Sequence, residues 1–286
     1  MRIAVLSDIH ANRLALEAVQ VAIADAQPDH IVVGGDVINR GPEPRACLLA
    51  ILACQTNENW LTLKGNHEDF VLMEAAGRLV DSGWMRKLYT HTHWTMLRVR
   101  DLLPAVETWP DTRSIIGPDG SEVRFVHASM RSNRHGLYEE MDEPQLIELT
   151  SPLPSVLVAG HTHVPFIRQV NSTLIVNSGA VGMSFDGLQQ ASFALLDWKD
   201  ARWNARIVRV DYDHAAAEEA FFSTGYMDDA GVMAPLILDE WRKARPRLGP
   251  WHHRYEQRVA SGELTIEESV AQLLQEESAA PAVRHW

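Results

Sequence analysis

The sequence is poor in cysteine and has no long apolar run. Only Cys47 and Cys54 occur in 286 residues, seven positions apart in a segment predicted to be helical. Two such thiols are typical of buried residues in a reducing compartment, and they indicate neither a zinc site nor a disulfide framework. Asp8 and His10 interrupt the apolar N-terminal segment too early for a signal peptide, and no apolar run is long enough to span a bilayer. We therefore expect a cytoplasmic protein that does not bind membranes.

Positive charge is also scarce. The chain has 26 basic and 38 acidic residues, which gives a formal net charge of -12. This balance disfavours strong nonspecific binding to nucleic acid or to an anionic membrane surface. A small anionic substrate would need a local concentration of positive charge.

Apolar periodicity predicts an α/β fold. Residues 2–7, 12–26 and 30–34 are typical of a strand, a helix and a second strand, a unit that favours parallel pairing. The later strands are closely spaced, and we expect them to be antiparallel. The remaining strands are predicted at 60–63, 123–126, 155–159, 173–176, 192–197 and 203–210. Together they indicate a sandwich of two sheets.

Helical patterns dominate two other regions. Residues 70–110 predict a helical excursion, and no strand signal occurs after residue 211. We therefore expect a domain over residues 1–212 and a helical C-terminal extension over 213–286, packed on that domain. In the extension, the pattern predicts helices near 215–222 and 231–244, a break at 246–250 and one last helix with a capping box at Thr265 to Glu268. The extension could cover the site or form a dimer contact.

Side chains that commonly bind metals follow five of the predicted strands, close to the point where each strand ends. A single Asp or His at such a position is usually a turn former or a surface residue. Five strand ends with the same kind of side chain are not explained in that way, and in α/β sheets the carboxyl ends of strands converge on one crevice. The residues are Asp8, His10, Asp36, Asn66, His67, His127, His161 and His163.

Seven of these residues, all except His67, are candidate ligands, which is more than a single catalytic zinc uses. Two ions that share Asp36 would use them all. Imidazole, carboxylate and amide donors suit first-row divalent metals, so we expect manganese first, with iron, zinc, nickel or cobalt as alternatives. Two ions about 3.5–4 Å apart can activate a bridging hydroxide and stabilise the oxygens of an in-line displacement, as phosphoester hydrolysis requires.

Five ordered motifs resemble the signature of the calcineurin-like metallophosphoesterases, over about residues 1–212. They are 8–10, 35–41, 65–68, the single His127 and 160–163. The resemblance implies a four-layer α/β/β/α sandwich of two mixed sheets. It assigns one ion to Asp8, His10, Asp36 and His163, and the other to Asp36, Asn66, His127 and His161. It also implies that His67 protonates the leaving group and that Arg40 binds a phosphoryl oxygen.

The sequence departs from parts of this family. Asn39 stands where the protein-phosphatase branch has an aspartate beside the catalytic histidine, while residues 39–44 resemble a bacterial branch that includes diadenosine tetraphosphate hydrolases. Arg131 and Arg134, in the loop after His127, are further candidate substrate contacts. Three tryptophans of the helical excursion could line a base-binding wall, but packing is the expected role of such residues: Trp84, Trp94 and Trp109.

These observations predict a dinuclear metal-dependent phosphoesterase. The expected substrates are small phosphomonoesters, phosphodiesters or nucleotides, hydrolysed by a hydroxide that bridges the two metals. The alternatives are a protein Ser/Thr phosphatase and an inactive interaction scaffold of the same fold. The scaffold is disfavoured because all seven candidate ligands and His67 are present.

Overall fold

Alternating side-chain contacts along the first strand explain how the chain builds two layers of sheet. The computed structural model describes residues 1–80 and 83–276. In β1 (Arg2–Leu6), Ile3 and Val5 pack among residues of both sheets, whereas Ala4 and Leu6 pack among helical residues. This is the period-two pattern of a strand that is covered on both faces.

The first sheet has the strand order β10-β9-β1-β2-β3. Strands β1, β2 and β3 are parallel, and β9 and β10 join them in antiparallel pairing. The other four strands of this sheet are β2 (His30–Val33), β3 (Leu61–Thr62), β9 (Ala191–Lys199) and β10 (Arg202–Val210). The sheet is therefore mixed.

The second sheet has the order β4-β5-β6-β8-β7, in which β5, β6 and β8 are parallel and the two edge strands are antiparallel to their neighbours. Its strands are β4 (Thr112–Ile116), β5 (Glu122–Val126), β6 (Val156–Ala159), β7 (Phe166–Val170) and β8 (Thr173–Asn177). The expectation that the later strands are all antiparallel was wrong for β6 and β8.

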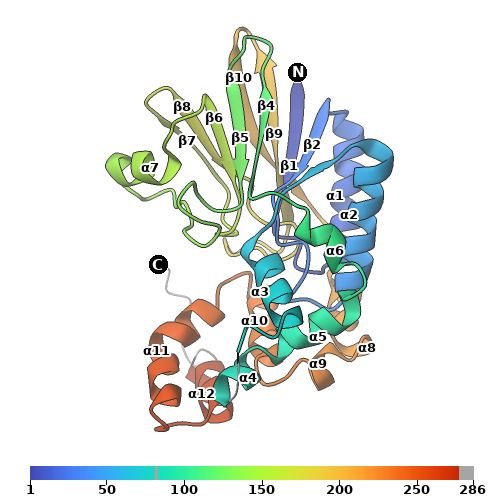
Figure 1. Cartoon of the computed structure of the whole chain (residues 1–286), viewed down its shortest axis with the longest axis vertical. Helices are drawn as coiled ribbons and strands as arrows, with labels where there is room; N and C mark the ends of the chain where they lie inside the picture. The colour runs from blue at the N-terminus through green and yellow to red at the C-terminus, as the bar shows by residue number, and fades with distance from the viewer. Residues whose placement is uncertain (81–82, 277–286) are drawn as a thin grey trace.

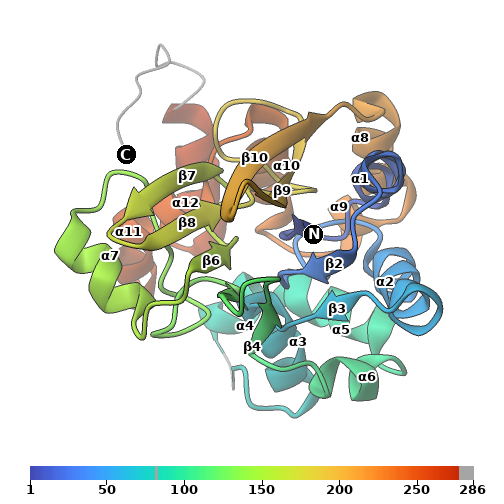
Figure 2. The same cartoon turned by 90° about the horizontal axis from the view of Figure 1, so that it is seen from above.

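Helices cover the outer face of each sheet. Helices α1 (Arg13–Ala26) and α2 (Pro44–Glu58) pack on the first sheet, and both cysteines are buried and free there. Helix α7 (Glu143–Thr150) packs on the second sheet. Figure 1 shows α1 and α2 to the right of the paired sheets and α7 to their left, and Figure 2 shows the same order from above. The predicted four-layer α/β/β/α sandwich is confirmed.

Two strands were not predicted from the sequence, and both lie at the edges of the second sheet. In β4 only the fourth of five residues is buried, and in β7 the inner three are exposed or partly exposed. Edge strands commonly carry polar residues, which limits pairing with other chains. That polarity hides the apolar alternation on which strand prediction depends.

The helical excursion contains α3 (Asn66–Ala75), α4 (Trp84–Leu88), α5 (Thr90–Val99) and α6 (Leu103–Glu107). The C-terminal extension contains α8 (His214–Ser223), α9 (Tyr226–Asp229), α10 (Ala234–Lys243), α11 (Leu248–Ala260) and α12 (Ile266–Glu276). The single last helix that we predicted is therefore two helices, and α11 begins inside the predicted break. Residues 81–82 of the excursion and 277–286 of the extension lie outside the described residues.

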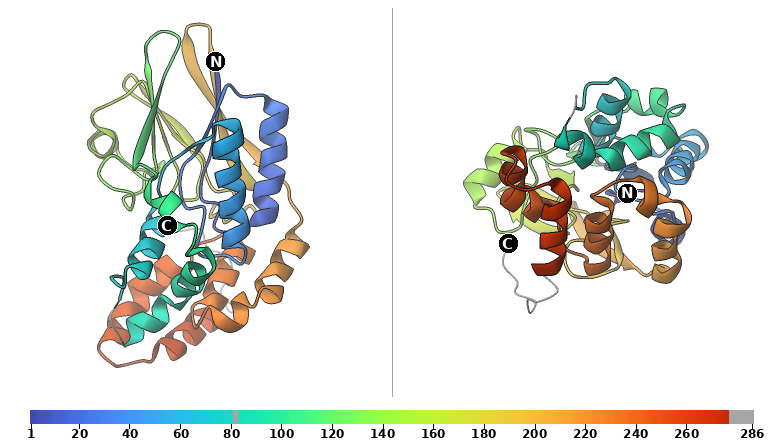
Figure 3. Two further views of the ribbon diagram at one scale, coloured as in Figure 1. Left: turned by 45° about the vertical axis from the view of Figure 1, so that its right-hand side comes forward. Right: turned by 90° about the horizontal axis from the view of Figure 1, so that it is seen from below.

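The extension and the excursion share one hydrophobic core. Leu88 and Trp94 pack with buried residues of α8 to α12, among them Trp251. Figure 3 shows these C-terminal helices, in orange and red, among the helices of the excursion. Both sets of helices lie beyond the carboxyl end of β1, toward the bottom of Figure 1. Among the described residues, no helix combines the length and the apolar composition needed to cross a membrane.

Candidate metal centre and substrate cavity

The predicted ligands from five strand ends converge in the structure. The ligand atoms of Asp8, His10 and His163 lie within 4.8 Å of one another, and so do those of a second group, which consists of Asp36, His127 and His161. Asn66 joins the second group, with its Oδ1 3.0 Å from His127 Nε2. This is the division between two sites that the family resemblance implies, and the ligand roles themselves stay predictions.

Left-handed backbone conformations bring these side chains inward. Positive φ angles occur at Asp8, His10, Asp36, Asn39, Arg40, His161 and His163. A non-glycine residue in this region costs about 1–3 kcal/mol and is retained only where the surrounding structure enforces it. Here the loop after β1 is hydrogen-bonded to the loop after β2, through Asp8 N to Gly35 O and His10 N to Asp36 O, both at 3.0 Å. His161 and His163 are thus not neighbours on one face of an extended strand.

Hydrogen bonds fix the imidazole rings of the first group with their Nε2 atoms facing each other. His10 Nδ1 donates to Asn39 O (3.2 Å), and His163 Nδ1 donates to Met183 O (2.5 Å). In a neutral ring, the other nitrogen then carries a lone pair, and the two Nε2 atoms are only 3.1 Å apart. Asp8 Oδ1, 3.3 Å from His163 Nε2, is buried and has no hydrogen-bond partner among the described residues. Such a set of acceptors is consistent with a site for a cation.

In the second group, hydrogen-bond acceptors again face one another. His127 Nδ1 donates to Gly34 O (2.8 Å), so its Nε2 faces Asn66 Oδ1 and, at 3.3 Å, Asp36 Oδ2. Metal-binding histidines usually donate their other ring N–H to a carbonyl or a carboxylate in this way. The residues present therefore fit two metal ions, with Asp36 between the two groups.

The residues of both groups are buried except His161, which is partly exposed, and their surroundings shift the pKa values of two of their histidines in opposite directions. Burial opposes protonation of His127, but the carboxylates of Asp36 and Asp8 outweigh it and raise the pKa of His127 to about 10. Burial, together with the neighbouring His163, lowers the pKa of His10 to about 3. In the metal-free protein, a proton on His127 supplies positive charge to the second group. A bound metal ion would supply that positive charge instead.

Glu68 is a positioning residue to which the sequence assigned no role. Its carboxylate accepts four backbone N–H groups, those of Asp36 (2.7 Å), Val37 (2.8 Å), Ile38 (3.3 Å) and Gly65 (2.8 Å). Burial and the nearby Asp36 raise the pKa of Glu68 to about 7, while two of these hydrogen bonds oppose the rise. Glu68 thereby joins the loops after β2 and β3. Its place at the third position of α3, where a capping acid is expected, was the available signal.

The orientation of Asn39 determines which nitrogen of His67 faces the substrate. Asn39 Oδ1 accepts the N–H of Arg40, and its Nδ2 donates to the Thr92 hydroxyl, so Nδ2 also faces His67 Nδ1 at 3.0 Å. In a neutral imidazole that accepts at Nδ1, the proton is on Nε2. His67 also has a ligand atom within 4.8 Å of those of His10 and Asp36. The amide therefore acts as a donor toward the ring, where a carboxylate would act as an acceptor.

Arg40 contacts the C-terminal extension. Its Nη1 lies 3.9 Å from Oε2 of Glu240, a carboxylate of α10 that is 1% exposed. Glu240 Oε1 accepts the N–H groups of Arg247 (2.6 Å) and Leu248 (2.8 Å) where α11 begins. One buried carboxylate thus joins Arg40 to two helices of the extension. No pattern in the sequence indicates this contact, because 200 residues separate the partners.

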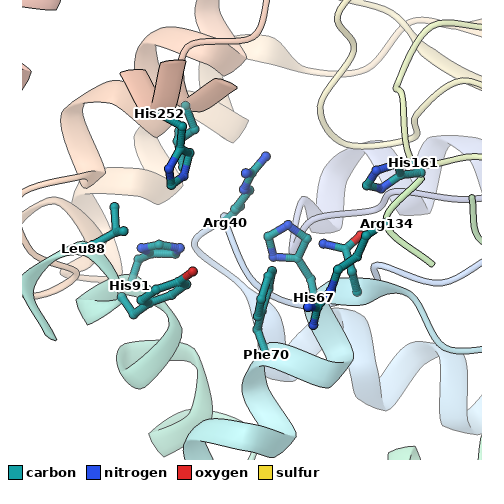
Figure 4. A pocket seen from close by; sticks show the side chains of 11 residues that line it. Arg40, His67, Phe70, Leu88, His91, Arg134, His161 and His252 are labelled. Carbon is teal, nitrogen blue, oxygen red and sulfur yellow. The ribbon is translucent and has the colours of Figure 1, made fainter. Parts of the chain in front are cut away.

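A cavity of about 250 Å³ lies beside the metal centre. It is lined by Arg40, Asn66, His67, Phe70, Leu88, Tyr89, His91, Arg134, His161, Leu248 and His252 (Figure 4). The Arg134 guanidinium lies 4.7 Å above the Phe70 ring. Arg131 is exposed and is not part of the lining, so its contact with substrate stays a prediction.

The three tryptophans of the excursion do not line this cavity. Trp94 and Trp109 are 3% and 4% exposed and belong to hydrophobic cores, and Trp84 packs 6.5 Å from Trp251. Their expected role in packing is confirmed.

Comparison with known proteins agrees with this geometry. A family model described as the calcineurin-like phosphoesterase superfamily domain matches residues 1–201. The chain belongs to this superfamily. Membership accounts for the fold, and the buried His and Asp clusters are consistent with the metal site that is typical of the superfamily.

Several relatives share most of their length with this chain. An uncharacterized protein of Methanocaldococcus jannaschii is 29% identical over 238 residues, which are 76% of this chain and 90% of that protein. The crystal structure of a metallophosphoesterase from Sphaerobacter thermophilus is 27% identical, with a TM-score of 0.62, and the match covers 85% of this chain and 99% of that one. A hypothetical protein from Pyrococcus horikoshii OT3, 17% identical with a TM-score of 0.69 over 82% of this chain and 97% of that one, shares the fold.

Proposed function

We propose that this phosphoesterase-family protein hydrolyses small phosphate esters, phosphomonoesters, phosphodiesters or nucleotides, with two divalent first-row metal ions. Manganese is our first choice of metal. The observation that carries the proposal is the convergence of acceptor atoms in two largely buried groups, directly beside a cavity lined by Arg40 and His67. When bound, two such ions would neutralise phosphoryl oxygens and lower the pKa of a water molecule.

The protein's own residues supply the remaining steps. Arg40 presents a planar guanidinium to the cavity and would bind a phosphoryl oxygen. The position of Arg40 is supported by the buried Glu240 carboxylate. His67 accepts from Asn39 at Nδ1, so its Nε2–H would donate a hydrogen bond to the leaving oxygen, and protonation of the ring would make it the general acid. Asn66, next to His67, would hold the second metal.

A phosphoprotein substrate has less support. Asn39 donates to His67 instead of accepting from it, so it cannot stabilise an imidazolium as a carboxylate would. Leu248 and His252 of the extension line the cavity, which limits the room for a polypeptide.

The test is a substrate panel with metal-free protein that is then loaded with Mn²⁺. The panel contains a phosphomonoester, a phosphodiester, nucleotides and a phosphopeptide. We expect hydrolysis of the small esters, loss of that hydrolysis in Asp36→Asn, and full activity in Asp200→Asn, which alters an exposed turn residue. Binding of two metal ions without any hydrolysis would support the scaffold, and preference for the phosphopeptide would support the protein phosphatase. Full activity of Asp36→Asn would contradict the shared-ligand assignment.

A further inference from the structure

The cavity has two chemically different halves. In Figure 4, Arg40 lies between a metal-side half, with His67, Arg134 and His161, and a distal half, with Leu88, His91 and His252. Tyr89 belongs to the distal half because its ring stacks on His91, with 6.4 Å between centroids and 24° between planes. Leu248 lies one turn before His252 on α11. Arg40 thus borders the distal half, and Arg134 lies in the metal-side half.

The distal half combines apolar and planar groups. Leu88 and Leu248 are 2% and 3% exposed, and three ring side chains complete the wall: Tyr89, His91 and His252. In the described part of the chain, no acidic side chain is among the lining residues, although acidic residues outnumber basic ones in the protein as a whole. Such a surface offers no carboxylate to a cationic group, and the nearest guanidinium, that of Arg40, lies at its border with the metal-side half. It suits an uncharged flat ring with polar edges.

The size of the cavity suits one small ligand. Its volume of about 250 Å³ lies just below the roughly 300–1,000 Å³ of typical ligand pockets. A single ring system with its sugar and phosphate is a ligand of that class. His252 Nδ1 lies 3.0 Å from Glu256 Oε2, so its other ring nitrogen is available for a hydrogen bond in the cavity.

We propose that the distal half is a leaving-group site for a nucleoside, so that the substrates are nucleoside monophosphates. This inference rests on the proposed function and narrows it. In the reaction, the bond between phosphorus and the nucleoside oxygen breaks and a bond from a water oxygen to phosphorus forms. His67 takes up the proton that the attacking water releases and gives a proton to the nucleoside oxygen, so the products are a nucleoside and inorganic phosphate. The C-terminal extension, through Leu248 and His252, thereby takes part in substrate selection.

The experiment compares nucleoside 5′-monophosphates with ribose 5-phosphate, which has the same ester and no base. With Mn²⁺-loaded protein, we expect kcat/KM to be about 10- to 100-fold higher for the nucleotides, the range that stacking of one base provides. His252→Trp, which fills the distal half, should reduce this ratio to about one. His253→Trp alters an exposed neighbour on the same helix and should keep the ratio. Tyr89→Leu is a second test if His252→Trp does not fold.

Different outcomes contradict different proposals. Equal kcat/KM for nucleotides and ribose 5-phosphate, or an unchanged ratio in both folded variants, would overturn the nucleoside site and leave the proposed function intact. No hydrolysis of any ester would overturn the proposed function. In that case, calorimetric binding decides the inference: tighter binding of nucleotides than of ribose 5-phosphate, lost in His252→Trp, would support the site, and equal binding would refute it.

Discussion

The four hydrogen bonds to Glu68 make a quantitative prediction. In Glu68→Gln, an amide NH₂ replaces one carboxylate oxygen, so two of the four backbone N–H groups face a donor instead of an acceptor. Leaving a buried donor unsatisfied costs about 1–3 kcal/mol. We therefore expect the free energy of unfolding to fall by about 2–6 kcal/mol. This is a large part of the ~5–15 kcal/mol that stabilises a typical domain.

The assay is urea unfolding followed by circular dichroism, in EDTA at pH 8. EDTA removes the contribution of metal binding, and pH 8 is above the pKa of about 7 of Glu68, so the carboxylate is ionised. The control is Glu148→Gln, an exposed position on α7, which should change stability by less than ~0.5 kcal/mol. A decrease below about 1 kcal/mol in Glu68→Gln would refute the reasoning.

The Mn²⁺ affinity of the same variant shows whether Glu68 also positions Asp36 or only stabilises the fold. Because Glu68 holds the backbone of Asp36, its substitution should weaken Mn²⁺ binding by about 10- to 100-fold, as is usual for residues that orient metal ligands. Calorimetry on the folded variant measures this affinity. Unchanged Mn²⁺ affinity in a destabilised variant would mean that Glu68 stabilises the fold without positioning Asp36.

Three other predictions follow from the site and its surroundings. His161→Ala and His163→Ala should each lower the bound metal from two equivalents to one, because the two rings belong to different groups. Elemental analysis after dialysis measures the bound metal. Loss of both equivalents in both variants would contradict this division. Gly182→Ala should destabilise the protein by about 1–3 kcal/mol in thermal unfolding, because a Cβ there would lie 1.8 Å from a backbone oxygen of the loop after β1; Gly249→Ala, with nothing within 4 Å, should not. Burial lowers the pKa of His91 to about 3, so the contribution of the neutral ring to stability is present above pH 6.5 and is lost as the pH falls. Between pH 7 and pH 5, the wild type should therefore lose about 2 kcal/mol more of its free energy of unfolding than His91→Gln. Equal losses in urea unfolding would be inconsistent with a neutral His91.

The strand ends could be predicted because a strand and the residues that follow it are recognised from a short stretch of sequence. Short apolar runs identified β1, β2, β3, β5 and β6, and the polar residues that follow these strands could be read directly. The polar edge strands β4 and β7 gave no such signal. Their pairing depends on the neighbouring strand and not on their own composition.

The supporting residues of the site were not predictable for a different reason. The direction in which the Asn39 amide points depends on Thr92 and on the backbone of Arg40, and the buried partner of Arg40 is Glu240. These contacts join parts of the chain that no periodicity or spacing relates. The sequence therefore indicated which groups could take part in the chemistry, and not how they are oriented.

The sequence by itself determined the set of metal-competent side chains and their position at strand ends, because parallel strands bring their carboxyl ends to one edge. The family resemblance implied different ions for His161 and His163, and the tertiary structure shows how two residues so close in sequence enter different groups, since both leave the extended conformation. It also brought Leu248 and His252 into the cavity, because the C-terminal helices bury their apolar faces against the helical excursion. Long-range burial, which has no local signature, thus placed the extension beside the site.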